Sequence, residues 1–292
     1  EAKPLAEYML LKKRLGQIKD GRNAWLKLVS EDDVIHGDVI TNGCITGRCS
    51  HKNPNTAQVP GVYSPYGTEC RALWHAPQGN VLIGFDAKAL ELRCLAGYLA
   101  FWDNGKYGDV VIDENQDIHT YNQQMFGVGT RDISKRLLYG ILYGCGYAKA
   151  GSIINPQEKD QERLISSGRG AIESFMAGVP ALAKLKENLG LNLAERGYLI
   201  GLDRRPLHCR SDFKALNVLL QSAGAVIMKQ VVVNIHDALT DAGLVYGMDW
   251  NQHAFIHDEI QLSCPPDLQQ TIIPHVLQAF VDAGNFYNFK CR

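Results

Sequence analysis

Two cations and two aromatic residues recur at four-residue spacing in the middle of the chain: Arg131, Lys135, Tyr139 and Tyr143. At about 100° per residue, this spacing places all four along one flank of a helix. The apolar residues that fall roughly opposite are Ile133, Leu137 and Ile141. Such a helix can pack its apolar side and present donors and rings to a ligand that carries phosphate and a base. Taken alone, the pattern also fits a core-packing helix with solvated charges.

Carboxylates occur at two other points in the chain. Asp86 follows the apolar run 81–85, which is bounded by turns and predicts a buried strand. Asp258 and Glu259, preceded by His257, form the polar tip of the segment 254–264, whose alternation predicts a hairpin or bent strand. If the two tips meet at one sheet edge, their oxygens suit magnesium.

Each carboxylate feature has an ordinary alternative when taken alone. A single Asp at a strand end is more often a helix cap, and His-Asp-Glu is more often a polar turn. The conjunction is more specific, because acids for two metal ions, cations for a triphosphate and a ring for a base together describe nucleotidyl transfer.

The elements that must position these residues follow from periodicity. Residues 89–100 predict a helix directly after Asp86, and His119 lies in a short helix that precedes the one beginning near Arg131. An amphipathic region spans 157–196, with interruptions expected at Gly168, Gly170 and Pro180.

The remaining segments predict a hairpin, a long helix and two peripheral regions. A small hairpin is expected over 199–208, and the longest helix over 213–242, where small residues permit close approach of another backbone. Residues 1–29 predict one or two helices broken near 16 and 20–21, and 34–75 is rich in turn formers.

Composition limits the classes of protein to which the chain can belong. The chain has 292 residues, a hydrophobic share of 46% and a net charge of −1, so nucleic-acid binding must be local. Eight scattered cysteines with no Cys-x-x-Cys pair argue against zinc and disulfides and fit a reducing cytosol. No signal peptide is visible and no run approaches about 18 apolar residues, so we expect no membrane partner. Because the chain begins at Glu1 rather than Met, we interpret it as a piece of something longer.

Three motifs in order resemble those of family A DNA polymerases. They are Gly84-Phe-Asp86 with Glu91 and Arg93, Arg131-x-x-x-Lys135-x-x-x-Tyr139-Gly with Tyr143, and His257-Asp258-Glu259. Further segments resemble the replicative polymerases of T-odd, short-tailed bacteriophages within that family. They include Thr46-Gly-Arg48, Ala57-Gln58, Asp117-Ile-His119 and Leu219-Leu-Gln221. The similarity runs from Glu1 to nearly the end.

The resemblance implies an α+β, right-hand architecture with a mixed, mainly antiparallel palm sheet and helical fingers. The expected regions are the base of the thumb (1–29), a first palm segment (30–98), the fingers (99–211) and a second palm segment (212–292). The implied activity is template-directed DNA synthesis from dNTP on primer–template DNA with two Mg²⁺ ions, inside an infected bacterial host cell.

The resemblance also implies roles for individual residues. Asp86 and Asp258 match the metal-holding carboxylates, and Glu259 matches an accessory acid near the primer end. Arg131, Lys135 and His119 match groups that hold the triphosphate, with Lys135 as general acid toward pyrophosphate. Tyr139 should stack beside the nucleotide, Tyr143 should lie near the templating base, and Glu91 should close over the sugar C2′. The residues that match DNA contacts are Arg48, Gln221, His257, Asn217 and Gln58.

Some regions of the family pattern find no match. The proofreading exonuclease and most of the thumb precede this region in the family, so we expect weak grip on duplex DNA. The family's C-terminal tail also has no counterpart after Cys291 and Arg292. A processivity factor, or a separate polypeptide carrying the thumb and exonuclease, would be a further partner.

Two other interpretations compete with a DNA polymerase. A single-subunit RNA polymerase shares the palm and an Arg/Lys/Tyr helix, but Glu91 and Glu259 argue against it. A non-catalytic DNA-binding or assembly module would follow from loss of the thumb, but Asp86, Asp258 and Lys135 argue that chemistry is retained.

Overall fold

A three-stranded antiparallel sheet lies under the carboxylates. The computed structural model describes residues 2–288, so the expectations about Glu1 and about a tail after Cys291 and Arg292 lie outside the described residues. The strands are β3 (Val81–Asp86), β7 (Glu259–Cys264) and β6 (Asn251–Ile256), in the order β3-β7-β6. In β3 the side chains alternate, with Ile83 and Phe85 buried and Asp86 exposed, as expected for a sheet with one covered face.

The hairpin predicted around His257 is confirmed. β6 and β7 are antiparallel neighbours, and His257 in the connecting turn has a left-handed φ of 59°. The backbone nitrogen of Ala87 donates to the carbonyl oxygen of Asp258 at 3.0 Å. This bond ties the turn of the hairpin to the end of β3.

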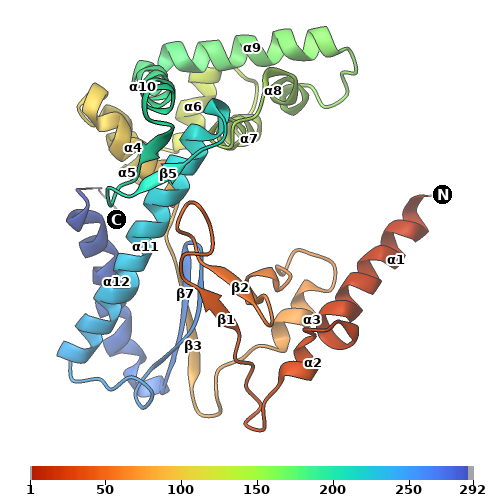
Figure 1. The fold of residues 1–292 in the computed structure, drawn as a ribbon, viewed down its shortest axis with the longest axis vertical. Helices are drawn as coiled ribbons and strands as arrows, with labels where there is room; N and C mark the ends of the chain where they lie inside the picture. Colours follow the sequence, from red (N-terminus) through yellow and green to blue (C-terminus); the bar gives the residue numbers. More distant parts are fainter. Residues whose placement is uncertain (1, 289–292) are drawn as a thin grey trace.

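Three helices pack with this sheet into one core. They are α4 (Leu90–Asp103), α11 (Ala215–Asp241) and α12 (Gln269–Phe286), and Figure 1 shows α11 running from the sheet into the upper half of the molecule. The long helix predicted over 213–242 is therefore confirmed. At Gly224 the nearest neighbour is a side chain, since a Cβ there would lie 3.1 Å from the side chain of Leu90 on α4.

The upper half of the molecule consists of helices and one hairpin (Figure 1). Its helices after α4 are α5 (Lys106–Ile112), α6 (Ile118–Phe126), α7 (Arg131–Leu142), α8 (Tyr147–Ile154), α9 (Gln161–Gly178) and α10 (Pro180–Arg196). The predicted hairpin is confirmed as β4 (Tyr198–Ile200) and β5 (Pro206–His208). The expected interruptions at Gly168 and Gly170 are wrong, since α9 continues through both, whereas Pro180 does begin a new helix. A Cβ on Gly168 would lie 2.0 Å from the carbonyl oxygen of Tyr147, so this glycine permits the close crossing of α8 and α9.

The N-terminal region extends to one side of the sheet (Figure 1). It contains α1 (Ala2–Leu15), the π-helical turn Gly16–Asp20 and α2 (Trp25–Leu28), which matches the predicted breaks. Residues 34–75 hold only short elements, as predicted: β1 (Asp38–Ile40), β2 (Ser50–Lys52), a 3₁₀ turn (Thr56–Gln58) and α3 (Gly67–Ala72).

The segment Asp212–Asp241 is long and apolar enough by length and composition to cross a membrane, which was not expected from the sequence. Of its most apolar window, 61% is buried inside the protein, as in a helix at the centre of a core.

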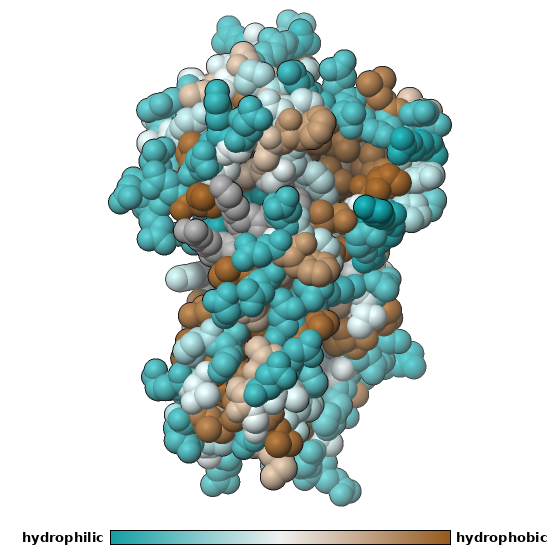
Figure 2. Space-filling model, turned by 90° about the vertical axis from the view of Figure 1, so that its left-hand side faces the viewer, coloured by the Kyte–Doolittle hydropathy of each residue, from teal (hydrophilic) through white to brown (hydrophobic). Residues whose placement is uncertain are grey.

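Figure 2 shows polar and apolar residues interspersed over the face that it views. Every cysteine within residues 2–288 is a free thiol, as the cysteine spacing predicted.

Candidate active site

Three carboxylates lie at one end of the sheet. Asp86 ends β3 and Glu259 begins β7, and the two residues are direct partners in the antiparallel register. Asp258 occupies the adjoining turn. The pKa of Asp86 is raised by burial first, then by the negative charges of Asp258 and Glu259. Strand register therefore gathers like charges that a cation would stabilise.

This arrangement fits magnesium better than a metal held by protein alone. Within residues 2–288, no three His, Cys, Asp or Glu side chains gather into a metal-binding group. Glu259 is also engaged, since its Oε1 accepts a hydrogen bond from Gln261 at 2.6 Å. Mg²⁺ is usually held by one or two carboxylates, with water and substrate phosphates supplying the other ligands. Asp86 and Asp258 are two carboxylates of the kind that such an incomplete set requires.

Glu91 is held at both carboxylate oxygens. Arg48 donates to its Oε1 at 3.1 Å, and the hydroxyl of Tyr143 donates to its Oε2 at 2.8 Å. The side chains of Arg48 and Glu91 are only 21% and 14% exposed. Burial, and then the hydrogen bond to Glu91, raise the pKa of Tyr143 to about 12, so this phenol remains a donor at neutral pH. Glu91 thus joins the loop after β1 to the end of α7.

His257 and Arg48 line a small hollow beside α11. Cys49, Lys229 and Phe255 also line it. The pKa of His257 is lowered by burial first and then by the positive charge of Arg48. The ring is therefore favoured in its neutral form, which offers both a donor and an acceptor nitrogen.

The cations expected on α6 and α7 lie next to each other. The helix α7 begins after Thr130, whose Oγ1 accepts from the backbone nitrogen of Ile133 at 3.3 Å. Arg131 and Lys135 on this helix are exposed, whereas His119 on α6 is buried. Burial lowers the pKa of His119, Asp117 opposes that effect, and Arg131 and Lys135 lower the pKa further. The positive charges of Arg131 and Lys135 therefore act on the His119 ring.

Tyr139 connects these cations with the carboxylates. Its ring lies 6.2 Å from that of His119 and 6.4 Å from that of Tyr143, with the two tyrosine planes inclined by 22°. The pKa of Tyr139 is raised by burial, then by Glu91 and Asp258. The half-buried ring of Tyr139 thus lies beside His119 and Tyr143 and is affected by the charges of Glu91 and Asp258.

Three residues expected to contact DNA make no side-chain hydrogen bond or ion pair with this group among the described residues. Asn217 and Gln221 are half-buried, one turn apart on α11. Gln58 is exposed, and its carbonyl oxygen accepts from Gln17 Nε2 at 3.1 Å in the N-terminal region. The assignment of these residues to DNA stays a prediction.

Two residues at the site, Asp117 and Lys229, had no role predicted from the sequence. Asp117 caps α6 and pairs with Arg131. Lys229 Nζ donates to the carbonyl oxygen of Thr41 at 2.6 Å and to Asn42 Oδ1 at 2.8 Å, which anchors the loop preceding Arg48. An Asp just before a helix signals a cap in the sequence, but no local signal reveals the contact of Lys229 across 188 positions.

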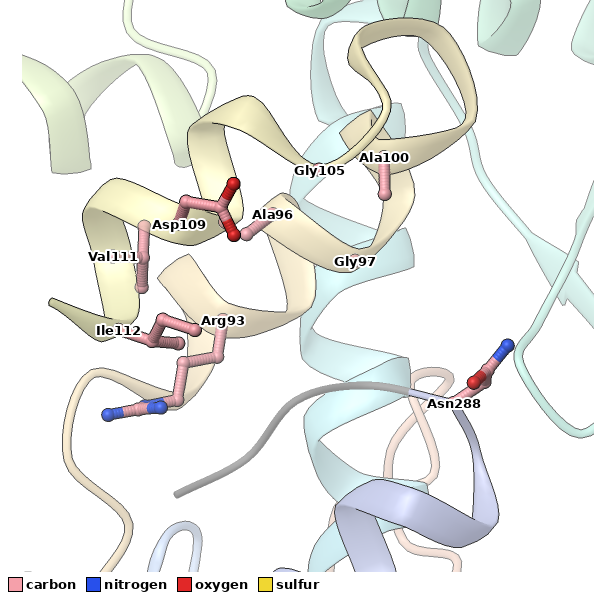
Figure 3. A pocket seen from close by; sticks show the side chains of 10 residues that line it. Arg93, Ala96, Gly97, Ala100, Gly105, Asp109, Val111, Ile112 and Asn288 are labelled. Carbon is pink, nitrogen blue, oxygen red and sulfur yellow. The ribbon is translucent and has the colours of Figure 1, made fainter.

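A cavity beside α4 and α5 lies away from these residues. It measures about 90 Å³ and is lined by residues of α4 and α5 that include Gly97, Ala100, Gly108 and Ile112, with Arg93, Asp109 and Asn288 among the polar ones (Figure 3). Arg93 Nε donates to the carbonyl oxygen of Lys88 at 2.8 Å. The cavity contains none of the carboxylates or cations described above, so we do not assign it to the chemistry.

The family model for DNA polymerase family A matches residues 1–289. The DNA-directed DNA polymerases of Enterobacteria phage T3 and Escherichia phage T7 are each 40% identical to the chain, over 98% of its length and 43% of theirs. The chain thus spans less than half the length of these relatives. The thermostable DNA polymerase I of Thermus thermophilus is 27% identical, over 78% of the chain and 28% of that protein.

A solved structure shares the fold. The polymerase domain of Pol1 from M. smegmatis, in complex with DNA primer-template and dNTP, aligns with a TM-score of 0.74 at 20% identity. The alignment covers 88% of this chain and 46% of that one. The predicted fold class, a mixed helical and antiparallel-sheet polymerase architecture, is therefore confirmed.

Proposed function

The chain belongs to DNA polymerase family A, and we propose that it performs template-directed DNA synthesis. In this reaction the 3′-hydroxyl of a primer attacks the α-phosphorus of a dNTP, a new phosphodiester bond forms, and pyrophosphate leaves. The observation that carries the proposal is the register of β3 and β7. It sets Asp86 opposite Glu259 and near Asp258 at one edge of the sheet. The charge of Asp258 also raises the pKa of Tyr139 on α7.

We assign metal binding to Asp86 and Asp258 and a secondary role to Glu259. Two bound Mg²⁺ ions would supply Lewis-acid stabilisation of the attacking and leaving oxygens. Asp86 and Asp258 would fix the position of these charges, because Asp86 is held by its strand register with Glu259 and Asp258 by the backbone bond from Ala87. Glu259, engaged with Gln261, would act near the primer end.

The residues of α6 and α7 would hold the nucleotide. Arg131, Lys135 and His119 would bind the triphosphate, and the exposed Lys135 would give a proton to the departing pyrophosphate. Tyr139 would stack beside the incoming base, where its ring is already supported by those of His119 and Tyr143.

The residues around Glu91 would monitor sugar and DNA. Glu91 would close over C2′ of the incoming nucleotide, with Tyr143 near the templating base. Arg48 and His257, with Gln221, would contact the minor groove or primer terminus, where acceptors common to all base pairs permit a check of geometry. Asn217 and Gln58 would add further DNA contacts. Because Arg48 donates to Glu91 in this structure, contact with DNA would be coupled to the group that senses the sugar.

The division of labour follows the family architecture. We assign residues 1–29 to the base of a thumb, 30–98 and 212–292 to the palm, and 99–211 to the fingers. Primer–template DNA and dNTP would be the partners, with a processivity factor or a polypeptide carrying the remaining domains as a further one. The cytoplasm of an infected bacterium is the proposed place of action, since two relatives are phage proteins.

Primer extension tests this proposal. The purified chain is incubated with a primer–template, Mg²⁺ and either deoxy- or ribonucleotides, and the products are separated by length. We expect extension with deoxynucleotides. Preferential extension with ribonucleotides would favour an RNA polymerase, and DNA binding without extension would favour a non-catalytic module.

The salt dependence of DNA binding provides a separate prediction. Because the net charge is −1, we expect this chain to make few phosphate contacts and release few counterions. Its affinity for primer–template should be weak, and the logarithm of that affinity should fall with a shallow slope against the logarithm of salt concentration. Fluorescence anisotropy across a salt series measures both. Tight binding at physiological salt would show that the chain grips the duplex without further domains.

A further inference from the structure

We propose that Asp117 is a positioning residue that orients Arg131 and His119 for an incoming nucleoside triphosphate. This inference rests on the proposed function and deepens it, because it concerns how the nucleotide site is organised before substrate arrives. Asp117 is not among the assigned ligands. Its role follows from contacts that join α6 to α7.

The first contact fixes the side chain of Arg131. Arg131 Nε donates to Asp117 Oδ2 at 2.5 Å, and Nη2 donates to Oδ1 at 2.9 Å. This two-pronged geometry uses one edge of the guanidinium and two of its five donor hydrogens. The opposite edge keeps its donors for a phosphate, so Asp117 orients Arg131 without competing for all of it.

The second contact fixes the start of α6. Asp117 Oδ2 also accepts from the backbone nitrogen of Thr120 at 3.0 Å and from its hydroxyl at 2.7 Å. This is an N-cap, which satisfies a backbone donor that the helix itself leaves free. His119 lies in the capped turn, so one carboxylate determines both the direction of the helix carrying His119 and the direction of Arg131.

A third contact completes the unit. Ser134 on α7 donates through Oγ to the carbonyl oxygen of His119 at 2.9 Å, and both residues are buried. Nδ1 of His119 is buried without a hydrogen-bond partner among the described residues. The side chain is thus held by packing and by the helix that Asp117 caps, beside Arg131 and Lys135.

The solvent exposure of the Arg131–Asp117 ion pair indicates whether the pair contributes mainly to folding stability or to the orientation of Arg131. The side chains of Arg131 and Asp117 are 49% and 38% exposed, and an ion pair in such a setting adds little to folding stability. The pair instead orients the Arg131 side chain. An unpaired arginine loses rotamer freedom when it binds a ligand, whereas an arginine that is already held in place loses less conformational entropy. Removing the pair should therefore weaken nucleotide binding more than it weakens the fold.

The substitution Asp117→Asn separates the two roles of the carboxylate. Asn caps helices about as well as Asp, so α6 should keep its start. Its amide offers Arg131 one acceptor and no charge, so the two-pronged contact is lost. Asp132→Asn is the matched control, because Asp132 neighbours Arg131 in the chain, is exposed, and carries the same charge.

The test is direct binding of dTTP with Mg²⁺ to the chain, by competition with a fluorescent deoxynucleoside triphosphate. We expect Asp117→Asn to raise the Kd roughly tenfold, as for a weakened charge-assisted contact. Asp132→Asn should change the Kd by less than about twofold, and thermal unfolding should be nearly unchanged in both variants. In an Arg131→Ala background, Asp117→Asn should have no further effect, because the group that it orients is gone.

Each contrary outcome is decisive. Equal Kd values for Asp117→Asn and the parent chain, or equal changes in the Asp117 and Asp132 variants, would overturn the positioning role. A full effect of Asp117→Asn without Arg131 would also overturn it. If dTTP binding follows the expected pattern but the parent chain extends no primer, the proposed function fails while this inference stands. If the parent chain does not bind dTTP, both fail.

Discussion

Replacing Asp86 or Asp258 by Asn should lower the rate of nucleotide insertion by roughly a thousandfold or more, because each change removes a charge that would hold magnesium. Asn keeps the size of the side chain and leaves the backbone bond between Ala87 and Asp258 in place. Affinity for primer–template should be largely spared. Single-turnover insertion, with DNA binding measured on the same preparations, gives both quantities.

Thermal unfolding distinguishes lost chemistry from lost structure. The pKa of Asp86 is raised in the folded protein, so folding is favoured when this carboxyl is protonated and is penalised as pH rises through the folded pKa. At neutral pH the Asp86→Asn variant should therefore be at least as stable as the parent chain. Full-rate insertion by either variant would contradict the assignment of these two carboxylates to the metal ions.

Replacing Glu91 by Ala should raise the incorporation of ribonucleotides relative to deoxynucleotides, with some loss of overall rate. Glu91 is fixed by Arg48 on one oxygen and by Tyr143 on the other, so it forms a rigid polar wall rather than a mobile side chain. A 2′-hydroxyl at this wall would meet both a clash and a disturbed hydrogen-bond pair. Loss of such a wall should change the ratio of specificity constants by roughly ten- to a hundredfold.

Two further variants test the explanation for Glu91. Tyr143→Phe removes the donor to Oε2 but keeps the ring, so it should relax the discrimination less than Glu91→Ala does. Glu91→Gln keeps the volume of the side chain but weakens the pair with Arg48, and should fall between the parent chain and the Ala variant. The measurement is single-nucleotide insertion of dNTP and the matching NTP on one template. An unchanged ratio in Glu91→Ala would mean that another residue senses the sugar.

Local sequence pattern predicted the elements around the site. The apolar run before Asp86, the alternation around His257 and the period beginning at Arg131 correspond to β3, the β6–β7 hairpin and α7. These predictions succeed because burial on one face imposes a period of 2 or about 3.6 on the sequence.

Contacts between segments far apart in the sequence could not be predicted from local periodicity. No local pattern shows that Asp86 pairs with Glu259 or that Tyr143 donates to Glu91 across 52 positions. The prediction of a helix break at Gly168 was wrong for a related reason. In the sequence, a glycine that lets two helices cross at short distance looks the same as a glycine that ends a helix. Motif resemblance named the site residues, whereas strand register and helix packing explain why these residues meet.

The most direct test of the central claim is a template-swap insertion assay with this chain. Four primer–templates that differ only in the templating base are each offered one dNTP at a time with Mg²⁺, and single-nucleotide products are quantified. We predict that each template directs addition of its complementary nucleotide, and that the Asp86→Asn variant loses this activity. No addition on any template, or addition that does not depend on the templating base, would contradict the assignment of template-directed DNA synthesis to this chain.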